Sequence, residues 1–169
     1  TYLAYYHLQA LEPLARALMR RFYHRCEVVM APAPSMAKSL REQRMNRNVI
    51  IWGRGVDREQ FNPGRRDMAW RRSVGISDDE MVIIFLGRIV MEKGLDVFAD
   101  AVHALDGQGV KYRVLAVGEG PARPWFEQQL PRAIFTGEIT GAELARAVAS
   151  ADVLFNPSVT EAFGNVTLE

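Results

Sequence analysis

The chain of 169 residues has little cysteine, no long apolar run and almost no net charge. Its single cysteine, Cys26, excludes an intramolecular disulfide framework and fits a reducing cytosol. No apolar stretch reaches the roughly 18 residues that a membrane-spanning helix needs, so we expect no such helix. The net charge of +1 gives no reason to expect nucleic acid as a partner.

The histidines and serines of the chain form no pattern typical of a metal site or of nucleophilic catalysis. The histidines His7, His24 and His103 lie far apart, and no pair has the spacing of a metal site. The serines lack the strand-to-helix setting of a nucleophile elbow, which argues against serine hydrolysis. Only two glycines follow the strand-like run 112–117, and they come too late in the chain for a dinucleotide fingerprint. We therefore expect no NAD site.

Strand-like and helix-like segments alternate regularly from about residue 65. The predicted strands are 81–86, 112–117, 133–135 and 153–155, and the predicted helices are 67–74, 95–105, 121–130 and 141–150, followed by a terminal helix. The run Val82–Leu86 is apolar without alternation, which indicates burial on both faces of a sheet. The predicted fold class is therefore α/β, with a doubly wound parallel sheet whose ligands bind beyond the carboxyl ends of the strands.

The first third of the chain has a different pattern. Residues 1–24 have the periodicity of an amphipathic helix, which Pro13 is expected to kink or split. The arginines of this segment suit either the solvent face of a core helix or a membrane surface. Short strands are predicted at 27–31 and 49–52, and the glycines and prolines of 53–64 mark a linker.

The last ten residues carry two carboxylates, Glu161 and Glu169, eight positions apart. Asn165 can cap a helix that begins at Val166, and the free N–H groups and positive dipole end of that helix form an anion site. Glu161 then precedes this anion site and Glu169 follows it. The arrangement suits a ligand that carries hydroxyls on both sides of a phosphate, as a nucleotide-sugar does.

A second motif follows the predicted strand 81–86. Gly87 lets the backbone turn and a ligand approach closely. Arg88 and Lys93 come next, near the start of the following helix. Two cations beside a helix start suit a pyrophosphate group, so we expect them to stabilise negative charge on a ligand.

These motifs resemble the Glu-x7-Glu and Gly-Arg…Glu-Lys-Gly signatures of the retaining, nucleotide-sugar-dependent glycosyltransferases of family 4, or glycosyl transferases group 1. That family has the GT-B fold, in which two Rossmann-like domains face each other across a cleft. The resemblance implies that residues 1–52 are the C-terminal part of the acceptor-side domain and that 53–64 are the interdomain linker. Residues 65–169 would be the donor-binding domain, incomplete at its C-terminus. A chain without an initiating Met that ends on Glu169 is expected to be a piece of a longer protein.

The resemblance also implies a role for each candidate site residue. The catalytic residues would be Arg88 and Lys93, which neutralise the donor diphosphate, and Glu161, which contacts hydroxyls of the donor sugar. Glu169 would hold the ribose. Further donor contacts are implied for Gly87, Gly118, Gly120, Ile139, Gly164, Asn165 and Val166. The family needs no metal and no cofactor, and the chain has no Asp-x-Asp motif.

The implied reaction moves a hexose from a GDP- or UDP-linked sugar to a lipid or glycan acceptor with retention of anomeric configuration. The segments 51–57 and 157–165 resemble most closely α-mannosyltransferases that use GDP-mannose and sulfoquinovosyl-diacylglycerol synthases. The expected location is the cytoplasm, and peripheral association of the parent enzyme with the inner face of the membrane stays open. The 169-residue chain by itself is expected to be inactive and to self-associate through its apolar first helix.

Three other functions stay open. A nucleotide-sugar epimerase shares the two-domain architecture, but it needs acidic catalytic residues that the sequence does not reveal. An NAD-dependent oxidoreductase needs the missing fingerprint. A non-catalytic nucleotide-sugar-binding domain is a different class, and the intact charged residues of the two motifs argue against it.

Overall fold

The computed structural model describes residues 9–53 and 55–158 of the chain. The chain divides into two compact units, and the boundary between Gly55 and Val56 falls inside the predicted linker 53–64. Each unit has a parallel sheet of its own.

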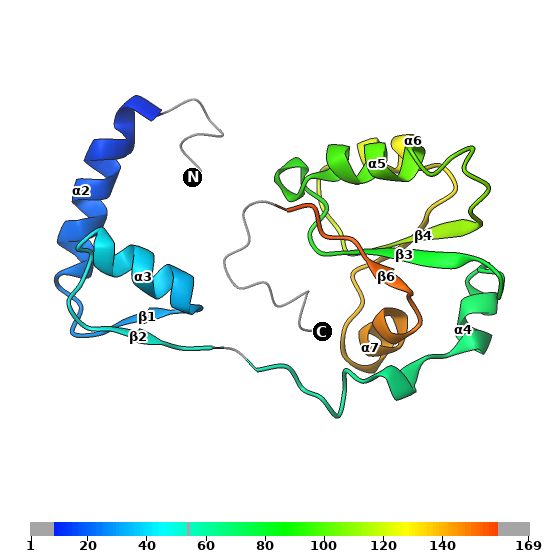
Figure 1. Ribbon diagram of the computed structural model, residues 1–169, viewed down its shortest axis with the longest axis horizontal. Coiled ribbons are helices and arrows are strands. Elements are labelled where there is room, and N and C mark those ends of the chain that lie inside the picture. The colour runs from blue at the N-terminus through cyan, green and yellow to red at the C-terminus, as the bar shows by residue number, and fades with distance from the viewer. Residues whose placement is uncertain (1–8, 54, 159–169) are drawn as a thin grey trace. The chain divides into compact units, whose positions relative to one another are not determined.

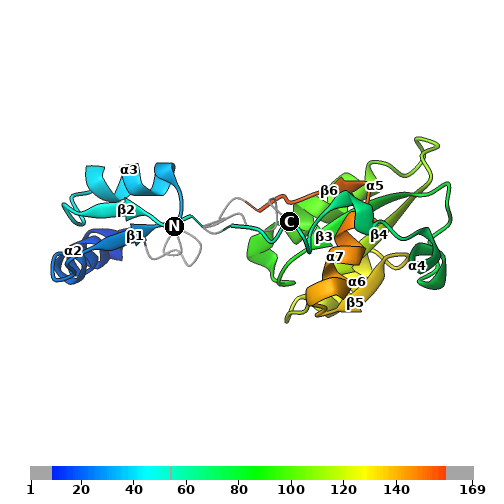
Figure 2. The ribbon, with the colours of Figure 1, turned by 90° about the horizontal axis from the view of Figure 1, so that it is seen from below.

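The first unit contains a two-stranded parallel sheet. Its described elements are η1 (Gln9–Leu11), α2 (Glu12–Tyr23), β1 (Val29–Ala31), α3 (Pro34–Glu42) and β2 (Val49–Ile51). The strands pair from Val29 opposite Val49, and α3 lies along one face of the pair (Figure 2). The buried core of this unit consists of Val29, Ala31, Ala37 and Val49. A parallel strand–helix–strand piece agrees with the expected part of a second Rossmann-like domain.

The prolines of this unit that lie in helices are found in the first turn. Pro13 lies in the first turn of α2, and Pro34 opens α3. At these positions the N–H that proline lacks would have no partner within the helix. Within the described residues, α2 begins at Glu12, directly after the separate 3-10 element η1, so the expected division of the helical segment at Pro13 agrees with the structure.

The second unit is built on a four-stranded parallel sheet. Its strands are β3 (Met81–Leu86), β4 (Tyr112–Val117), β5 (Ile134–Gly137) and β6 (Val153–Leu154). They lie in the order β5-β4-β3-β6, and all neighbours are parallel. Numbered within this unit, the order is 3-2-1-4, which is the order of a Rossmann-like sheet, and it reverses between β3 and β6.

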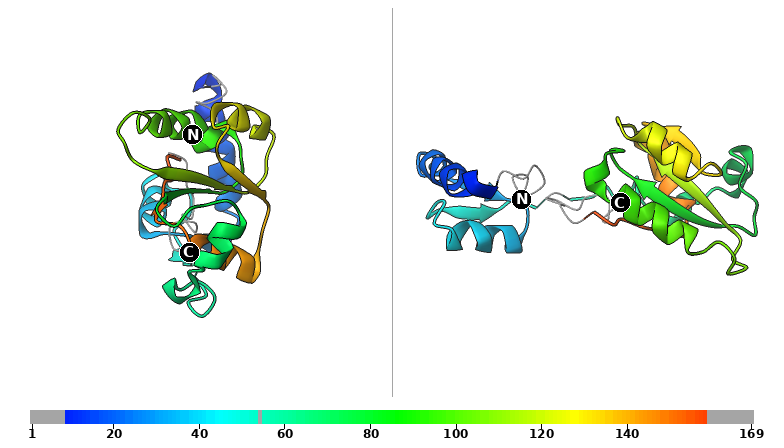
Figure 3. Two further views of the ribbon diagram at one scale, coloured as in Figure 1. Left: turned by 90° about the vertical axis from the view of Figure 1, so that its right-hand side faces the viewer. Right: turned by 90° about the horizontal axis from the view of Figure 1, so that it is seen from above.

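Helices cover both faces of this sheet, as Figures 1 and 3 show. The helical elements are η2 (Pro63–Arg65), α4 (Met68–Ser73), η3 (Met91–Lys93), α5 (Leu95–His103), α6 (Arg123–Gln129) and α7 (Gly141–Ala149). Ile83 and Phe85 of β3 face the core formed with α5 and α6. Val82 and Ile84 face the core formed with α4 and α7. Because β3 supplies both cores, its apolar run is continuous, and the predicted doubly wound α/β fold class is confirmed.

The element boundaries differ from the predicted ones where a loop is tied to a neighbour. Strands 81–86 and 112–117 are as predicted. Helix α6 begins at Arg123 and not at Pro121. The N–H of Ala122 donates to the carbonyl oxygen of Ile89 at 3.1 Å, and this bond keeps the preceding turn outside the helix.

Candidate functional site

The loops after β3, β4 and β5 meet at the carboxyl edge of the sheet in the second unit. Beyond the strands, the N–H of Gly87 donates to the carbonyl of Val117 at 3.0 Å. The N–H of Gly118 donates in turn to the carbonyl of Gly137 at 2.9 Å. These bonds hold the three loops together at the edge where ligands bind in open α/β sheets.

Two of the expected site glycines allow this close approach. Gly118 has a φ of +134°, and a Cβ at this position would overlap the carbonyl oxygen of Gly87. A Cβ on Gly120 would overlap the backbone of Ile89. A larger residue at either position would force the loops apart. Loop packing therefore accounts for both glycines, and their donor contacts stay a prediction.

A pocket of about 420 Å³ opens where these loops meet. Its lining consists of Leu86, Gly87, Arg88, Val117, Gly118, Glu119, Glu138 and Ile139. The lining thus includes four of the predicted site residues, namely Gly87, Arg88, Gly118 and Ile139. The volume lies in the range of small-molecule sites, roughly 300–1,000 Å³. Glycine backbone and apolar side chains offer a surface that a flat ligand group can approach closely.

Side chains of both charges surround this pocket. Arg88 is exposed and makes no hydrogen bond or ion pair through its side chain with the described part of the chain. Glu119 is paired with Arg123, which also donates to Glu127 at 2.7 Å. The hydrogen bond to Glu127, together with the nearby Glu119, raises the pKa of the Arg123 guanidinium. Arg88 is therefore a cation that an anionic ligand can reach.

Two carboxylates, Glu119 and Glu138, also line the pocket. The sequence reasoning gave Glu119 no role, and it placed Glu138 only beside Ile139, where the family resemblance implies the border of the base. Glu138 is exposed, and within residues 9–53 and 55–158 its carboxylate makes no hydrogen bond or ion pair. The signal that could have identified both residues is their position. Each directly follows a glycine at the carboxyl end of a strand, Gly118 after β4 and Gly137 at the end of β5.

Lys93 lies in a neighbouring loop and not in the lining of this pocket. It ends η3, and Gly94, with a φ of +73°, is the cap residue directly before α5. A Cβ on Gly94 would lie 3.0 Å from the carbonyl oxygen of Pro157, in the loop after β6. The Glu-Lys-Gly motif therefore adjoins the segment that leads into the terminal motif.

The remaining predicted site residues lie outside the described part of the chain. They are Glu161, Gly164, Asn165, Val166 and Glu169. Their roles stay predictions. Among the described residues, no group of three or more His, Cys, Asp or Glu is placed to hold a metal ion. No helix within the described ranges has the length and apolar character needed to cross a membrane.

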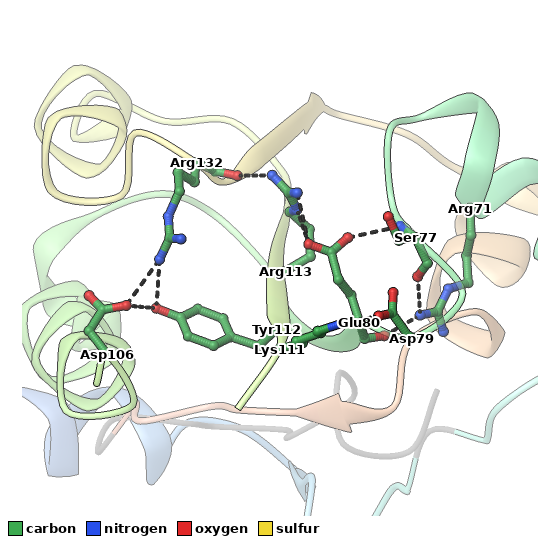
Figure 4. A network of polar contacts seen from close by, with 9 residues as sticks. All are labelled: Arg71, Ser77, Asp79, Glu80, Asp106, Lys111, Tyr112, Arg113 and Arg132. Carbon is green, nitrogen blue, oxygen red and sulfur yellow. Dashed lines mark hydrogen bonds and ion pairs between the residues drawn. The ribbon is translucent and has the colours of Figure 1, made fainter. Parts of the chain in front are cut away.

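The amino edge of the same sheet holds a network of paired charges (Figure 4). Arg113 donates to Glu80 at 2.8 Å, and Asp106 accepts from Arg132 at 3.0 Å and from the Tyr112 hydroxyl at 2.7 Å. Burial, with the hydrogen bond to Asp106, raises the pKa of Tyr112. Pockets of about 400 and 680 Å³ open beside this network. Because its polar groups satisfy one another and ligands bind at the other edge of such sheets, we assign this network a structural role.

A doubly wound parallel sheet with a glycine-lined pocket at its carboxyl edge defines the class of Rossmann-like nucleotide-binding proteins. Residues 80–169 match the family model described as Glycosyl transferases group 1. Residues 1–60 match the model described as Glycosyltransferase Family 4. The chain therefore belongs to the group 1 glycosyl transferases, as its motifs implied.

Curated relatives agree with this family. A GDP-mannose-dependent alpha-mannosyltransferase of Corynebacterium glutamicum is 33% identical over 158 residues, which cover 94% of this chain and 37% of that protein. Its counterpart of the same name in Mycolicibacterium smegmatis is 37% identical over 149 residues, 88% of this chain and 38% of that protein. Sulfoquinovosyl transferase SQD2 of Arabidopsis thaliana is 32% identical over 155 residues, 88% of this chain and 30% of that protein. The chain thus spans less than half the length of these relatives.

Solved structures show the same fold. The sucrose-phosphate synthase of Thermosynechococcus elongatus matches with a TM-score of 0.74 and 20% identity, over 91% of this chain and 40% of that one. HepE of Anabaena, solved in complex with UDP and glucose, matches with a TM-score of 0.68 and 18% identity, over 89% of this chain and 42% of that one. These structures are GT-B glycosyltransferases, and the likeness supports Rossmann-like domains in this chain.

Proposed function

We propose that the protein containing this chain is a retaining glycosyltransferase that moves a hexose from a nucleoside-diphosphate sugar to a lipid or glycan acceptor. The observation that supports this most directly is the carboxyl-edge pocket in a chain of the group 1 family. That pocket gathers Arg88 with two glycines and Ile139, which the family motifs assign to the donor. The names of the curated relatives favour a GDP-linked mannose as the donor.

In the proposed reaction, the bond between the anomeric carbon and the diphosphate breaks while the acceptor hydroxyl attacks from the same face of the sugar, and the proton of that hydroxyl passes to the departing phosphate oxygen. Negative charge grows on the departing diphosphate, and Arg88 and Lys93 stabilise it. Glu161 contacts hydroxyls of the donor sugar, and Glu169 holds the ribose. No carboxylate acts as a nucleophile, and the reaction needs neither metal nor cofactor.

Calorimetric titration of the full-length protein with GDP, UDP and NAD tests this proposal. We expect GDP or UDP to bind and NAD not to bind. Proton NMR of the product should then show the same anomeric configuration as the donor, with or without EDTA. Binding of NAD alone would identify an oxidoreductase, and conversion of the nucleotide sugar into its epimer without an acceptor would identify an epimerase.

A lipid acceptor would place the enzyme in the cytoplasm at the inner face of a membrane. Helix α2 supports this placement, because it combines basic residues with exposed apolar ones. These residues are Arg16, Arg20, Arg21, Leu14, Leu18 and Phe22. Co-sedimentation of the full-length protein with anionic and neutral lipid vesicles measures this association, and absence of binding to both would contradict it.

A further inference from the structure

We propose that Glu138 selects guanine as the base of the donor nucleotide. The inference rests on the proposed function, because it assigns the base end of the same pocket. Glu138 would act as a specificity-determining residue and not in the chemical step.

The order of the strands separates the two ends of the pocket. Arg88 follows β3 and Glu138 follows β5, with β4 between them. Neighbouring strands lie about 4.8 Å apart, so the carboxyl ends of β3 and β5 lie roughly 10 Å apart. A nucleotide whose phosphates lie beside Arg88 can therefore extend along this edge and reach the end of β5 with its base. Ile139, in the lining at that end, offers an apolar contact for a flat ring.

The charged side chains that line the pocket indicate which part of the nucleotide binds at the β3 end and which part binds at the β5 end. Glu119 is held in an ion pair with Arg123, which Glu127 shares. Glu138 lines the pocket without an ion pair or hydrogen bond to the described residues, so its negative charge repels a phosphate. An ionised carboxylate only accepts hydrogen bonds, and the β5 end of the pocket therefore favours a group that presents N–H donors.

Among the common bases, guanine fits this requirement best. Its N1–H and N2–H groups are adjacent donors, which the two oxygens of one carboxylate can accept together. Uracil presents one N–H between two carbonyl oxygens, which a carboxylate repels. Adenine presents its amino group beside a ring nitrogen that is itself an acceptor. The GDP-mannose dependence in the names of the relatives agrees with this assignment.

The test compares GDP, UDP and inosine diphosphate, which lacks only the 2-amino group of GDP, by calorimetry on the full-length protein. Wild type should bind GDP more tightly than inosine diphosphate, and UDP most weakly. Glu138→Gln should weaken the binding of GDP by on the order of 10- to 100-fold, because the base loses hydrogen bonds to a charged group. The preference for GDP over inosine diphosphate should shrink, and UDP affinity should be unchanged or higher.

Glu143→Gln is the matched control. Glu143 is an exposed carboxylate in the first turn of α7 and does not line the pocket, so its removal should leave the three affinities unchanged. An unchanged base preference in Glu138→Gln would overturn the inference and leave the proposed function intact. Equal weakening of all three nucleotides would also overturn the inference, because it indicates a contact to the ribose or the phosphate. A wild-type protein that prefers UDP would overturn it as well. If wild type bound none of them, the proposed function would fall together with the inference.

Discussion

Arg71 is only 1% exposed, although its side chain carries a charge. Its guanidinium donates to Asp152 Oδ2 at 3.1 Å and to the carbonyl oxygens of Ser150 and Glu80. Asp152 also accepts from the N–H of Val82 at 2.8 Å. A buried charge is tolerated when it is paired and hydrogen-bonded in this way. This one side chain therefore links α4 to the starts of β3 and β6.

Arg71→Met should lower the free energy of unfolding by about 2–3 kcal/mol at neutral pH, because two carbonyl oxygens and the partly exposed carboxylate of Asp152 each lose a charged donor. Urea unfolding of the 169-residue chain measures this change. Arg72→Met is the control, because Arg72 forms an exposed pair with Asp78 and its loss should have little effect. Equal stability of wild type and Arg71→Met would contradict the structural role of Arg71.

The difference in unfolding free energy between wild type and Arg71→Met should depend on pH. Burial raises the pKa of Asp152, but the N–H of Val82 and the guanidinium groups of Arg66 and Arg71 outweigh it, so the net pKa is lowered. The stabilisation from Asp152 is therefore complete above its unfolded pKa, about 3.9, and is lost as the pH falls through the folded value. The difference between wild type and Arg71→Met should accordingly be smaller at pH 3 than at pH 7.

Arg88 and Lys93 carry the prediction for the reaction itself. In the full-length enzyme, Arg88→Ala or Lys93→Ala should lower kcat by on the order of a hundredfold, because each removes a positive charge from the leaving diphosphate. Arg132→Ala is the control, since Arg132 belongs to the network at the amino edge of the sheet. Steady-state kinetics with saturating donor measures kcat for each variant. Near-normal turnover in both the Arg88 and the Lys93 variant would contradict the assignment of these residues to the diphosphate.

At the scale of elements, the loops after β3 and β4 depend on each other. Gly87 and Gly118 both have left-handed backbone, with φ of +145° and +134°. A Cβ on Gly118 would meet the carbonyl of Gly87, whereas a Cβ on Gly87 would meet nothing within 4 Å. The two glycines therefore share the same backbone strain and differ in the space around them.

Gly118→Ala should therefore destabilise the chain more than Gly87→Ala. Both variants place a side chain on left-handed backbone, at roughly 1–3 kcal/mol each. Only Gly118→Ala also forces the β3 and β4 loops apart, so its cost should be the larger. Thermal unfolding of the two variants beside wild type gives the comparison, and equal midpoints would show that the loops are not in close contact.

At the scale of the whole molecule, the first unit leaves apolar side chains uncovered. Met30 is 59% exposed and Ile50 44%, on adjacent strands of a sheet that α3 covers on one face. On α2, Leu14, Leu18 and Phe22 are exposed by 60% or more. An isolated two-stranded sheet is marginally stable in water, and apolar groups of this number favour association.

The 169-residue chain studied alone should therefore self-associate and show no sugar transfer. Light scattering across a concentration series tests the first point, and an assay with nucleotide sugar tests the second. The double variant Met30→Thr/Ile50→Thr should reduce association. Val97→Thr, at a 52% exposed position of the second unit, should not. A stable wild-type monomer, or transfer by this chain alone, would contradict the expectation.

Much of the second unit could be predicted from local sequence. The continuous apolar runs 81–86 and 112–117 become β3 and β4 with the expected bounds, because burial on both faces demands such runs. The family could also be predicted from the sequence, because its motifs consist of charged residues at fixed spacing after predicted strands. The starts of helices were predicted less accurately than the bounds of these strands. Pro121 was expected to start a helix, but α6 begins at Arg123, because the N–H of Ala122 is bonded to the carbonyl oxygen of Ile89 in another loop.

The sequence by itself determined the fold class, the family and the loops that carry the candidate site, because these follow from apolar periodicity and from residues close together in the chain. Tertiary structure decided which loops meet. Only the sheet order brings Arg88, Gly118 and Ile139 around one pocket while leaving Lys93 in a neighbouring loop. It also distinguishes Glu119, which is held in an ion pair with Arg123, from Glu138, which makes no ion pair with the part of the chain that the structure describes. These differences depend on distances between strands that are remote in sequence, and no local pattern encodes them.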